Sequence, residues 1–351
     1  MKRNKILIII LGIAIVSGIT CSGIIIAKGL QEGKAASTDA SSLKKQNYPK
    51  AWQLEKTKLD EFSEISISLD YANISILPSD DYYLEYRLDG TCTEPEYGIS
   101  NGKFHFQEGS VQNQYKFSFH LFAAPSSKES YYVNLYVPKE KYFDLLTLTC
   151  DSGNVDLEQI NAKKADLTLD YGNLTLGSFT GDTLSIDADS GNVELKNADC
   201  SDLTISAEYG NVTGDTFTVS HKADLKLDSG NLVLSQLTAD TLSLKDEYGD
   251  CTVDSITVKK GDFSLDSGNL ALKNAVLGTT TIDSAYGNTA LTLADKISDY
   301  NYDLKAEYGS IQLDGKKISK NEDDETIYQK TDSKKKDLIQ IHCDSGNIDI
   351  K

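Results

Sequence analysis

Residues 184–212, LSIDADSGNVELKNADCSDLTISAEYGNV, contain one pattern twice. Apolar residues occupy every second position before the first Gly, at Leu184, Ile186 and Ala188, and the same positions before the next Gly, 19 residues later. Polar residues fill the positions between them. A period of two is typical of a β-strand with one buried and one solvated face. The Gly and its Asp and Asn neighbours predict a corner at which the backbone adopts positive φ.

The same unit recurs through the second half of the chain. A tetrapeptide of Asp or Glu, Ser or Tyr, Gly and Asn, or a near copy of it, returns at spacings of 19, 19, 19, 20, 19, 19, 19, 22 and 37 residues. The residue before the Gly alternates between Ser and Tyr from Ser152 to Tyr286, and Tyr308 breaks the strict alternation. A degenerate copy occupies residues 70–73. We expect the following residues to form structural corners: Gly153, Asn154, Gly172, Asn173, Gly191, Asn192, Gly210, Asn211, Gly230, Asn231, Gly268, Asn269, Gly287, Asn288, Gly346 and Asn347.

This repeat predicts an all-β fold. One unit of 19 residues cannot bury its apolar face alone. Stacked units can, because their inward rows then form a continuous core. We therefore expect residues 144–351 to form a β-solenoid (β-helix) of 19-residue coils, with a charged insertion at 314–337 as a surface loop. An antiparallel β-sandwich remains an alternative, as does a coil of 38 residues with Ser and Tyr corners on opposite sides.

The region before the repeat is also rich in strand-like stretches. Residues 54–143 contain long aromatic-rich segments without the 19-residue period. A solenoid end exposes unpaired backbone, so we expect this region to be an N-terminal β-rich cap on the first coil. Residues 28–53 are small, polar and charged, which predicts a flexible linker.

Residues 1–27 have the pattern of a cytoplasmic stub and transmembrane anchor. Ile6 to Ala27 are 22 uncharged, mostly apolar residues, preceded by Lys2, Arg3 and Lys5. Such a helix is long enough for a hydrocarbon core of about 30 Å. The positive flank favours a cytoplasmic N-terminus, with the rest of the chain outside the cell. A cleaved signal peptide is the alternative, although the apolar run is longer than is usual for one.

Composition excludes one class of partner. The formal net charge is -18, from 35 Lys+Arg and 53 Asp+Glu, and the only Arg residues are Arg3 and Arg87. Nucleic-acid binding depends on basic patches and Arg forks, so we expect none. The repeats contain no Arg, which also argues against a polysaccharide lyase with a basic catalytic residue.

The sequence shows no catalytic or metal-binding constellation. The four His residues, His105, His120, His221 and His342, have no metal-ligand spacing, and the recurring corner Ser has no His partner. We expect no enzymatic activity and no cofactor. The cysteines of the repeat fall in inward rows, so we expect small core hydrophobes without disulfides: Cys150, Cys200, Cys251 and Cys343.

Two outward rows are candidates for binding. Acidic residues precede most corners and would form a line along one edge, a weak Ca²⁺ candidate for which a solvated face is the favoured interpretation. Its candidate ligands are Asp151, Asp170, Asp189, Asp228 and Asp266. The corner Tyr residues could stack on sugar rings or a partner protein, but packing over the neighbouring Ser is the favoured interpretation.

With its strand-rich start, the Val137-Pro138-Lys139 segment and the DSGNV and DYGNL repeats, the chain resembles a bacterial family of so-called putative adhesins over residues 60–351. The resemblance implies an extracytoplasmic β-helical domain of Gram-positive envelopes, with some relatives in envelope-stress responses and no established catalytic residues. We expect a single-pass membrane protein whose C-terminal domain is an extracellular, non-catalytic adhesion or surface-interaction module. Its expected partner is an envelope glycan or protein. The alternatives are an envelope-stress or regulatory component and, less favoured, a polysaccharide-active enzyme.

Overall fold

The computed structural model describes residues 50–112, 130–319, 325–335 and 337–351. The chain divides into two units, Met1–Asn47 and Tyr48–Lys351, and every described element belongs to the second. The predicted transmembrane segment lies outside the described residues. Within the described ranges, no helix has the length and apolar character needed to cross a membrane.

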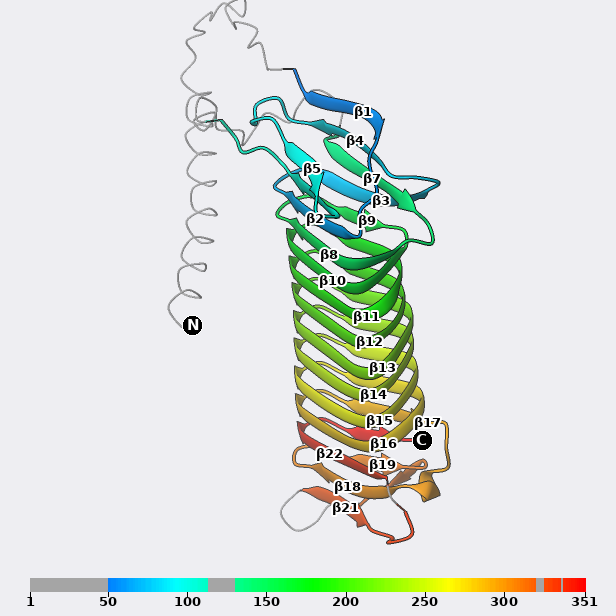
Figure 1. Cartoon of the computed structure of the whole chain (residues 1–351). Coiled ribbons are helices and arrows are strands. Elements are labelled where there is room, and N and C mark those ends of the chain that lie inside the picture. The colour runs from blue at the N-terminus through cyan, green and yellow to red at the C-terminus, as the bar shows by residue number, and fades with distance from the viewer. Residues whose placement is uncertain (1–49, 113–129, 320–324, 336) are drawn as a thin grey trace, which may run out of the picture. The chain divides into compact units, whose positions relative to one another are not determined.

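Long strands that each make most of one coil build the solenoid (Figure 1). They stack in parallel in the order β10 (Ile160–Tyr171), β11 (Leu174–Ser190), β12 (Val193–Tyr209), β13 (Val212–Ser229), β14 (Leu232–Tyr248), β15 (Cys251–Ser267) and β16 (Leu270–Tyr286). Leu174 pairs with Val193, so one coil contains 19 residues. The predicted solenoid of 19-residue coils is confirmed. The antiparallel sandwich and the 38-residue coil are wrong.

The core is a set of inward rows shared by all coils. Leu184, Ile186 and Leu203 are fully buried, at 0% to 1% exposure, and pair with the same positions of neighbouring coils. Burial of one such side chain stabilises the fold by about 1.5–3 kcal/mol. Four cysteines are buried and free in these rows: Cys150, Cys200, Cys251 and Cys343. They therefore pack as small apolar side chains.

The 20-residue unit is accommodated without disturbing the rows. Four residues of β13, Val219 to Lys222, lie opposite three residues in each neighbouring strand, which is a β-bulge. His221 lies in this bulge, and its Nδ1 is 2.7 Å from Asp202 Oδ1. The extra residue therefore stays outside the core.

The degenerate copy at residues 70–73 forms the first coil, although it lies within the region expected to be the cap. β2 (Glu64–Leu69) pairs in parallel with β8 (Tyr142–Cys150), and β3 (Asn73–Ser79) pairs in parallel with β9 (Val155–Leu157). β2 and β3 thus form the first coil, the strands that follow them in the sequence belong to the cap, and β8 begins the second coil.

The cap covers the other edge of this first coil. β6 (Lys103–Gln107) and β7 (Tyr132–Pro138) pair in parallel with β2 and β3. Antiparallel strands then end the sheet: β5 (Glu96–Ser100) on β6, β4 (Tyr83–Leu88) on β7, and β1 (Trp52–Lys58) on β4. The switch to antiparallel pairing closes the solenoid edge.

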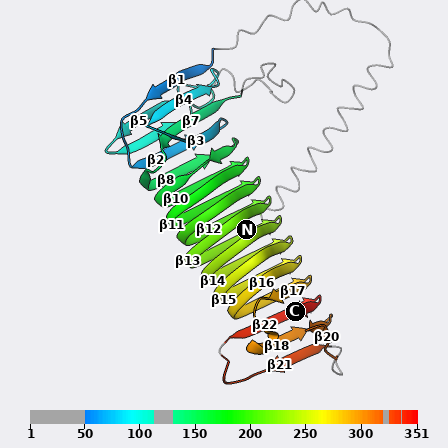
Figure 2. The same cartoon turned by 90° about the vertical axis from the view of Figure 1, so that its right-hand side faces the viewer.

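At the other end, the stacking order differs from the sequence order (Figure 2). β22 (Leu338–Ser345) pairs in parallel with both β16 and β18 (Asn301–Ala306), so it lies between them. β23 (Ile348–Ile350) likewise lies between β17 (Thr289–Leu293) and β19 (Ile311–Leu313). β22 and β23 follow β18 and β19 in the sequence but precede them in the stack.

The stretch 314–337, expected to be a surface loop, contains two strands. β21 (Thr326–Lys330) pairs antiparallel with β18, and β20 (Lys316–Lys317) pairs antiparallel with β19. Both strands cover edges that β18 and β19 would otherwise expose, which explains why this charged stretch folds back on the stack.

Candidate functional site

The corners stack into one edge of the solenoid, which we call the corner edge. In stacking order its central residues are Ala72, Gly153, Gly172, Gly191, Gly210, Gly230, Gly249, Gly268, Gly287, Gly346 and Gly309. A Cβ on any of these glycines would lie only 1.6–2.1 Å from the carbonyl oxygen of the preceding corner. Six of them have φ between +135° and +153°. Both the close contact and the backbone conformation require glycine.

An Asn ladder runs beside these glycines. The backbone N–H and the Nδ2–H of Asn173 both donate to Asn154 Oδ1, at 3.0 and 3.2 Å. The same pair of bonds links the other asparagines of the row, which begins at Asn73: Asn154, Asn192, Asn211, Asn231, Asn288 and Asn347. Asp250 takes one place in the ladder. Its Oδ1 accepts both bonds from Asn269, but, without a side-chain amide, it donates only its backbone N–H to Asn231 Oδ1.

The residue before each corner forms a second row, which we call the tyrosine row. Its order along the stack is Tyr71, Ser152, Tyr171, Ser190, Tyr209, Ser229, Tyr248, Ser267, Tyr286, Ser345 and Tyr308. Tyr308 breaks the alternation in the sequence, but the stack restores it, because β22 inserts Ser345 between Tyr286 and Tyr308.

The tyrosines of this row face solvent. The six side chains are 57% to 79% exposed, so the predicted packing over neighbouring Ser residues does not bury them. Adjacent strands lie about 4.8 Å apart, which places successive tyrosines about 9.6 Å apart along the edge. The edge is therefore a regular row of accessible aromatic rings with a small hydroxyl residue between each pair.

An acidic row flanks the tyrosine row. Asp151, Asp170, Asp189, Asp228 and Asp266 each lie two residues before a stacked corner glycine. Partial burial, followed by the charges of Asp170 and Asp187, raises the pKa of Asp189. In the described part of the chain, none of the five predicted Ca²⁺ ligands belongs to a group of three side chains close enough to share an ion. The row thus creates a negative field without forming a preorganised cation site.

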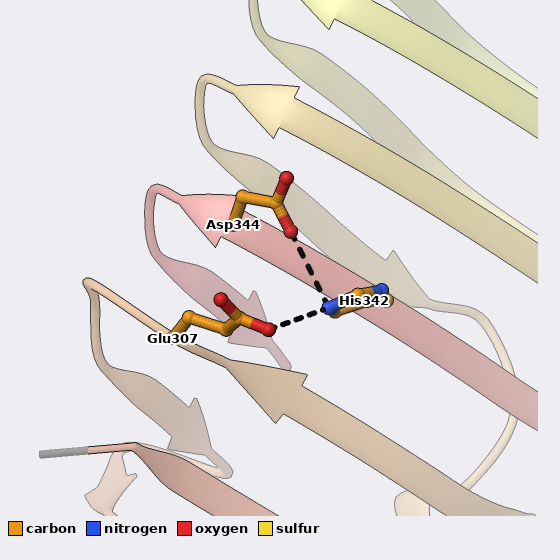
Figure 3. A group of neighbouring side chains, drawn as sticks. All are labelled: Glu307, His342 and Asp344. Atoms are coloured by element: carbon orange, nitrogen blue, oxygen red, sulfur yellow. Dashed lines mark hydrogen bonds and ion pairs between the residues drawn. The ribbon is translucent and has the colours of Figure 1, made fainter. Parts of the chain in front are cut away.

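One cluster with metal-ligand chemistry joins the inserted strand to its neighbour (Figure 3). His342 Nε2 lies 3.4 Å from both Glu307 Oε1 and Asp344 Oδ1, and the ligand atoms of the three residues lie within 4.8 Å of one another. Lys305 Nζ also lies 2.7 Å from Glu307 Oε1. Lys305, and then His342, lower the pKa of Glu307. A lysine ammonium therefore already compensates one of the carboxylates.

Sequence reasoning missed this cluster. Glu307 and His342 are 35 residues apart, and they meet only because β22 lies beside β18. The available signal was positional: His342 stands four residues before Gly346, and Glu307 two residues before Gly309, so both fall in outward columns of the repeat.

A groove lies beside the tyrosine row in the last coils. Its volume is about 470 Å³, and its lining includes Glu247, Asp266, Asp283, His342 and Asp344. Ala285 lines it at a position where most other coils carry a carboxylate. The acidic row therefore has a gap at Ala285, which lines the groove.

An inward row of the repeat contains a buried acid, Asp246, which sequence reasoning also missed. Asp246 is 1% exposed, and its Oδ2 accepts a hydrogen bond from Cys251 Sγ at 3.1 Å. Its Oδ1 is buried without a hydrogen-bond partner. Burial raises the pKa of Asp246. The sequence contained a signal for it: Asp246 occupies an inward position at which the neighbouring coils have Leu227 and Leu265.

Comparison with known proteins identifies the family through a sequence-family model. No curated protein matches the sequence. Similar solved structures include a putative lipid binding protein from Parabacteroides distasonis (14% identity, TM-score 0.45, 86% of this chain and 97% of that chain). They also include a putative adhesin from Bacteroides fragilis (14%, 0.34, 86% and 97%) and a putative cell adhesion protein from Clostridium sporogenes (12%, 0.20, 86% and 99%). A family model described as Toastrack DUF4097 matches residues 62–200 and 180–351. The chain belongs to the Toastrack DUF4097 family.

Proposed function

We propose that the chain is a non-catalytic interaction module of the cell surface, anchored by Ile6 to Ala27 and presenting its corner edge to an extracellular partner. The observation that carries the proposal is the tyrosine row, six aromatic side chains of 57% to 79% exposure aligned on one edge. Aligned exposed aromatic surface is typical of a site that binds another molecule.

The chemistry of the edge supports binding rather than catalysis. A reactive centre needs one constellation of unlike groups held together. The corner edge instead repeats the same Tyr, Ser, Asn and carboxylate side chains from coil to coil. Such repetition offers many equal contacts to an extended partner.

The test uses the full chain in detergent micelles and isolated cell envelopes. We expect a variant with Tyr171, Tyr209, Tyr248 and Tyr286 replaced by Ser to lose at least nine-tenths of the co-sedimentation with envelopes. Tyr142 is 49% exposed but lies outside the row, so Tyr142→Ser is the matched control and should bind normally. Equal binding by both variants would refute the proposal. Protease accessibility in intact cells tests the outside location of the solenoid.

A further inference from the structure

The spacing of the tyrosine row matches the repeat of one class of polymer. Successive tyrosines are two coils apart, about 9.6 Å. This is close to the advance of one disaccharide in an extended β-1,4-linked hexose chain. We infer that the corner edge binds a neutral β-1,4-linked glycan lying parallel to the solenoid axis, with one tyrosine for each disaccharide. This inference rests on the proposed function and names the partner.

The chemistry of the row fits such a chain. The C–H face of a pyranose ring is weakly positive and packs on the negative face of an aromatic ring. The Ser between each pair of tyrosines leaves room for the second sugar and offers a hydroxyl. Each ladder Asn has two amide hydrogens, and the bond from Asn173 to Asn154 uses one of them. Carboxylates of the acidic row can accept hydrogen bonds from sugar hydroxyls.

Charge narrows the class of glycan. The acidic row follows the site with a gap at Ala285, and burial, followed by repulsion from Asp170 and Asp187, raises the pKa of Asp189. An anionic polymer would meet this field along its full length and be repelled. The groove of about 470 Å³ lined by Ala285 and Asp266 gives a neutral sugar substituent space along the acidic row.

The regular edge makes the inference testable by changing the spacing alone. A copy of residues 173–191 inserted after Gly191 adds one coil, which has Ser in the tyrosine row. Tyr171 and Tyr209 are then three coils apart. An inserted copy of residues 173–210 adds two coils and restores the two-coil spacing. The two variants differ in register but have the same corner chemistry.

The experiment measures the dissociation constant for chitohexaose and cellohexaose with the full chain in micelles, with maltohexaose as the α-linked control. We expect one or both β-linked hexamers to bind, affinity to increase with oligomer length, and maltohexaose not to bind. For chains long enough to span the insertion, the one-coil variant should bind at least tenfold more weakly and the two-coil variant should match the wild type. Melting temperatures of both variants verify that they fold.

The outcomes separate this inference from the proposed function. If the four-tyrosine variant loses envelope binding but no β-linked oligomer binds the wild type, the glycan assignment is wrong and the partner is a protein. Equal affinity of the one-coil and two-coil variants for chains long enough to span the insertion would also overturn it. If the four-tyrosine variant keeps envelope binding, the proposed function itself fails.

Discussion

The middle of the solenoid and its two ends follow different rules. From β11 to β16, each strand pairs with the strands before and after it in sequence. At the ends, β8 meets β2 and β22 separates β16 from β18, so partners come from distant parts of the chain. The middle is therefore specified by the repeat alone. The ends are specified by the need to pair or cover exposed strand edges.

Deletions give the sharpest test of this difference. Removal of residues 173–210 takes out two whole coils and should leave a cooperative fold, because Gly172 then meets Asn211 in the same register. Removal of residues 338–351 should abolish cooperative unfolding at the C-terminal end. It deletes Ile339, Ile341, Ile348 and Ile350, which are 0% to 1% exposed, and each such burial stabilises by about 1.5–3 kcal/mol. Urea unfolding followed by circular dichroism measures both. Equal damage from the two deletions would contradict the comparison.

A single added methyl group should destabilise the fold more at a corner glycine of the middle than at a glycine near the end. We expect Gly210→Ala to cost about 3 kcal/mol or more in free energy of unfolding. Its Cβ would lie 1.9 Å from the Gly191 carbonyl oxygen, and its φ is +151°. Gly315 has φ +71° but no atom within 4 Å of an added Cβ, so Gly315→Ala should cost about 1 kcal/mol. Denaturant titrations measure both free energies of unfolding. Similar losses in the two variants would show that the contact with the Gly191 carbonyl oxygen does not determine the cost.

The buried acid makes one middle coil sensitive to pH. The folded state raises the pKa of Asp246, so the fold is most stable below the unfolded pKa and loses stability as pH rises through the folded value. Asp246→Leu should raise the free energy of unfolding at pH 7.5 by about 1–3 kcal/mol, because Leu fills this row in both neighbouring coils. Asp246→Asn should flatten the profile between pH 4 and 7.5. Unfolding curves at several pH values test this. If Asp246→Asn leaves the pH dependence of stability unchanged, that dependence comes from other groups.

The smallest effect concerns the interrupted ladder. Asp250→Asn provides the missing amide donor to Asn231 and should stabilise the fold by about 0.5–1.5 kcal/mol. Asn211→Asp creates the same interruption two coils earlier and should destabilise it by a similar amount. Thermal unfolding at neutral pH compares them. If Asp250→Asn and Asn211→Asp shift the melting temperature in the same direction, the hydrogen bonds of the ladder do not determine the effect.

Much of the middle could be predicted from the sequence because every inward position returns after 19 residues, as with Leu184 and Leu203. The ends could not, since the pairing of β22 with β16 joins residues about 60 positions apart that share no period. The alternation of Tyr and Ser was visible in the sequence. Its continuity through Ser345, and the meeting of His342 with Glu307, depended on that unpredicted insertion.

The insertion of β22 also determines when this end of the solenoid can form. A ribosome adds about 5–20 residues per second, so β16 and β18 both exist before the strand that separates them is made. Until then, the two strands present unpaired N–H and C=O groups to each other and to any other chain nearby. Residues 338–350 end this vulnerable interval, so a delay in their synthesis would prolong the period in which newly made copies can aggregate.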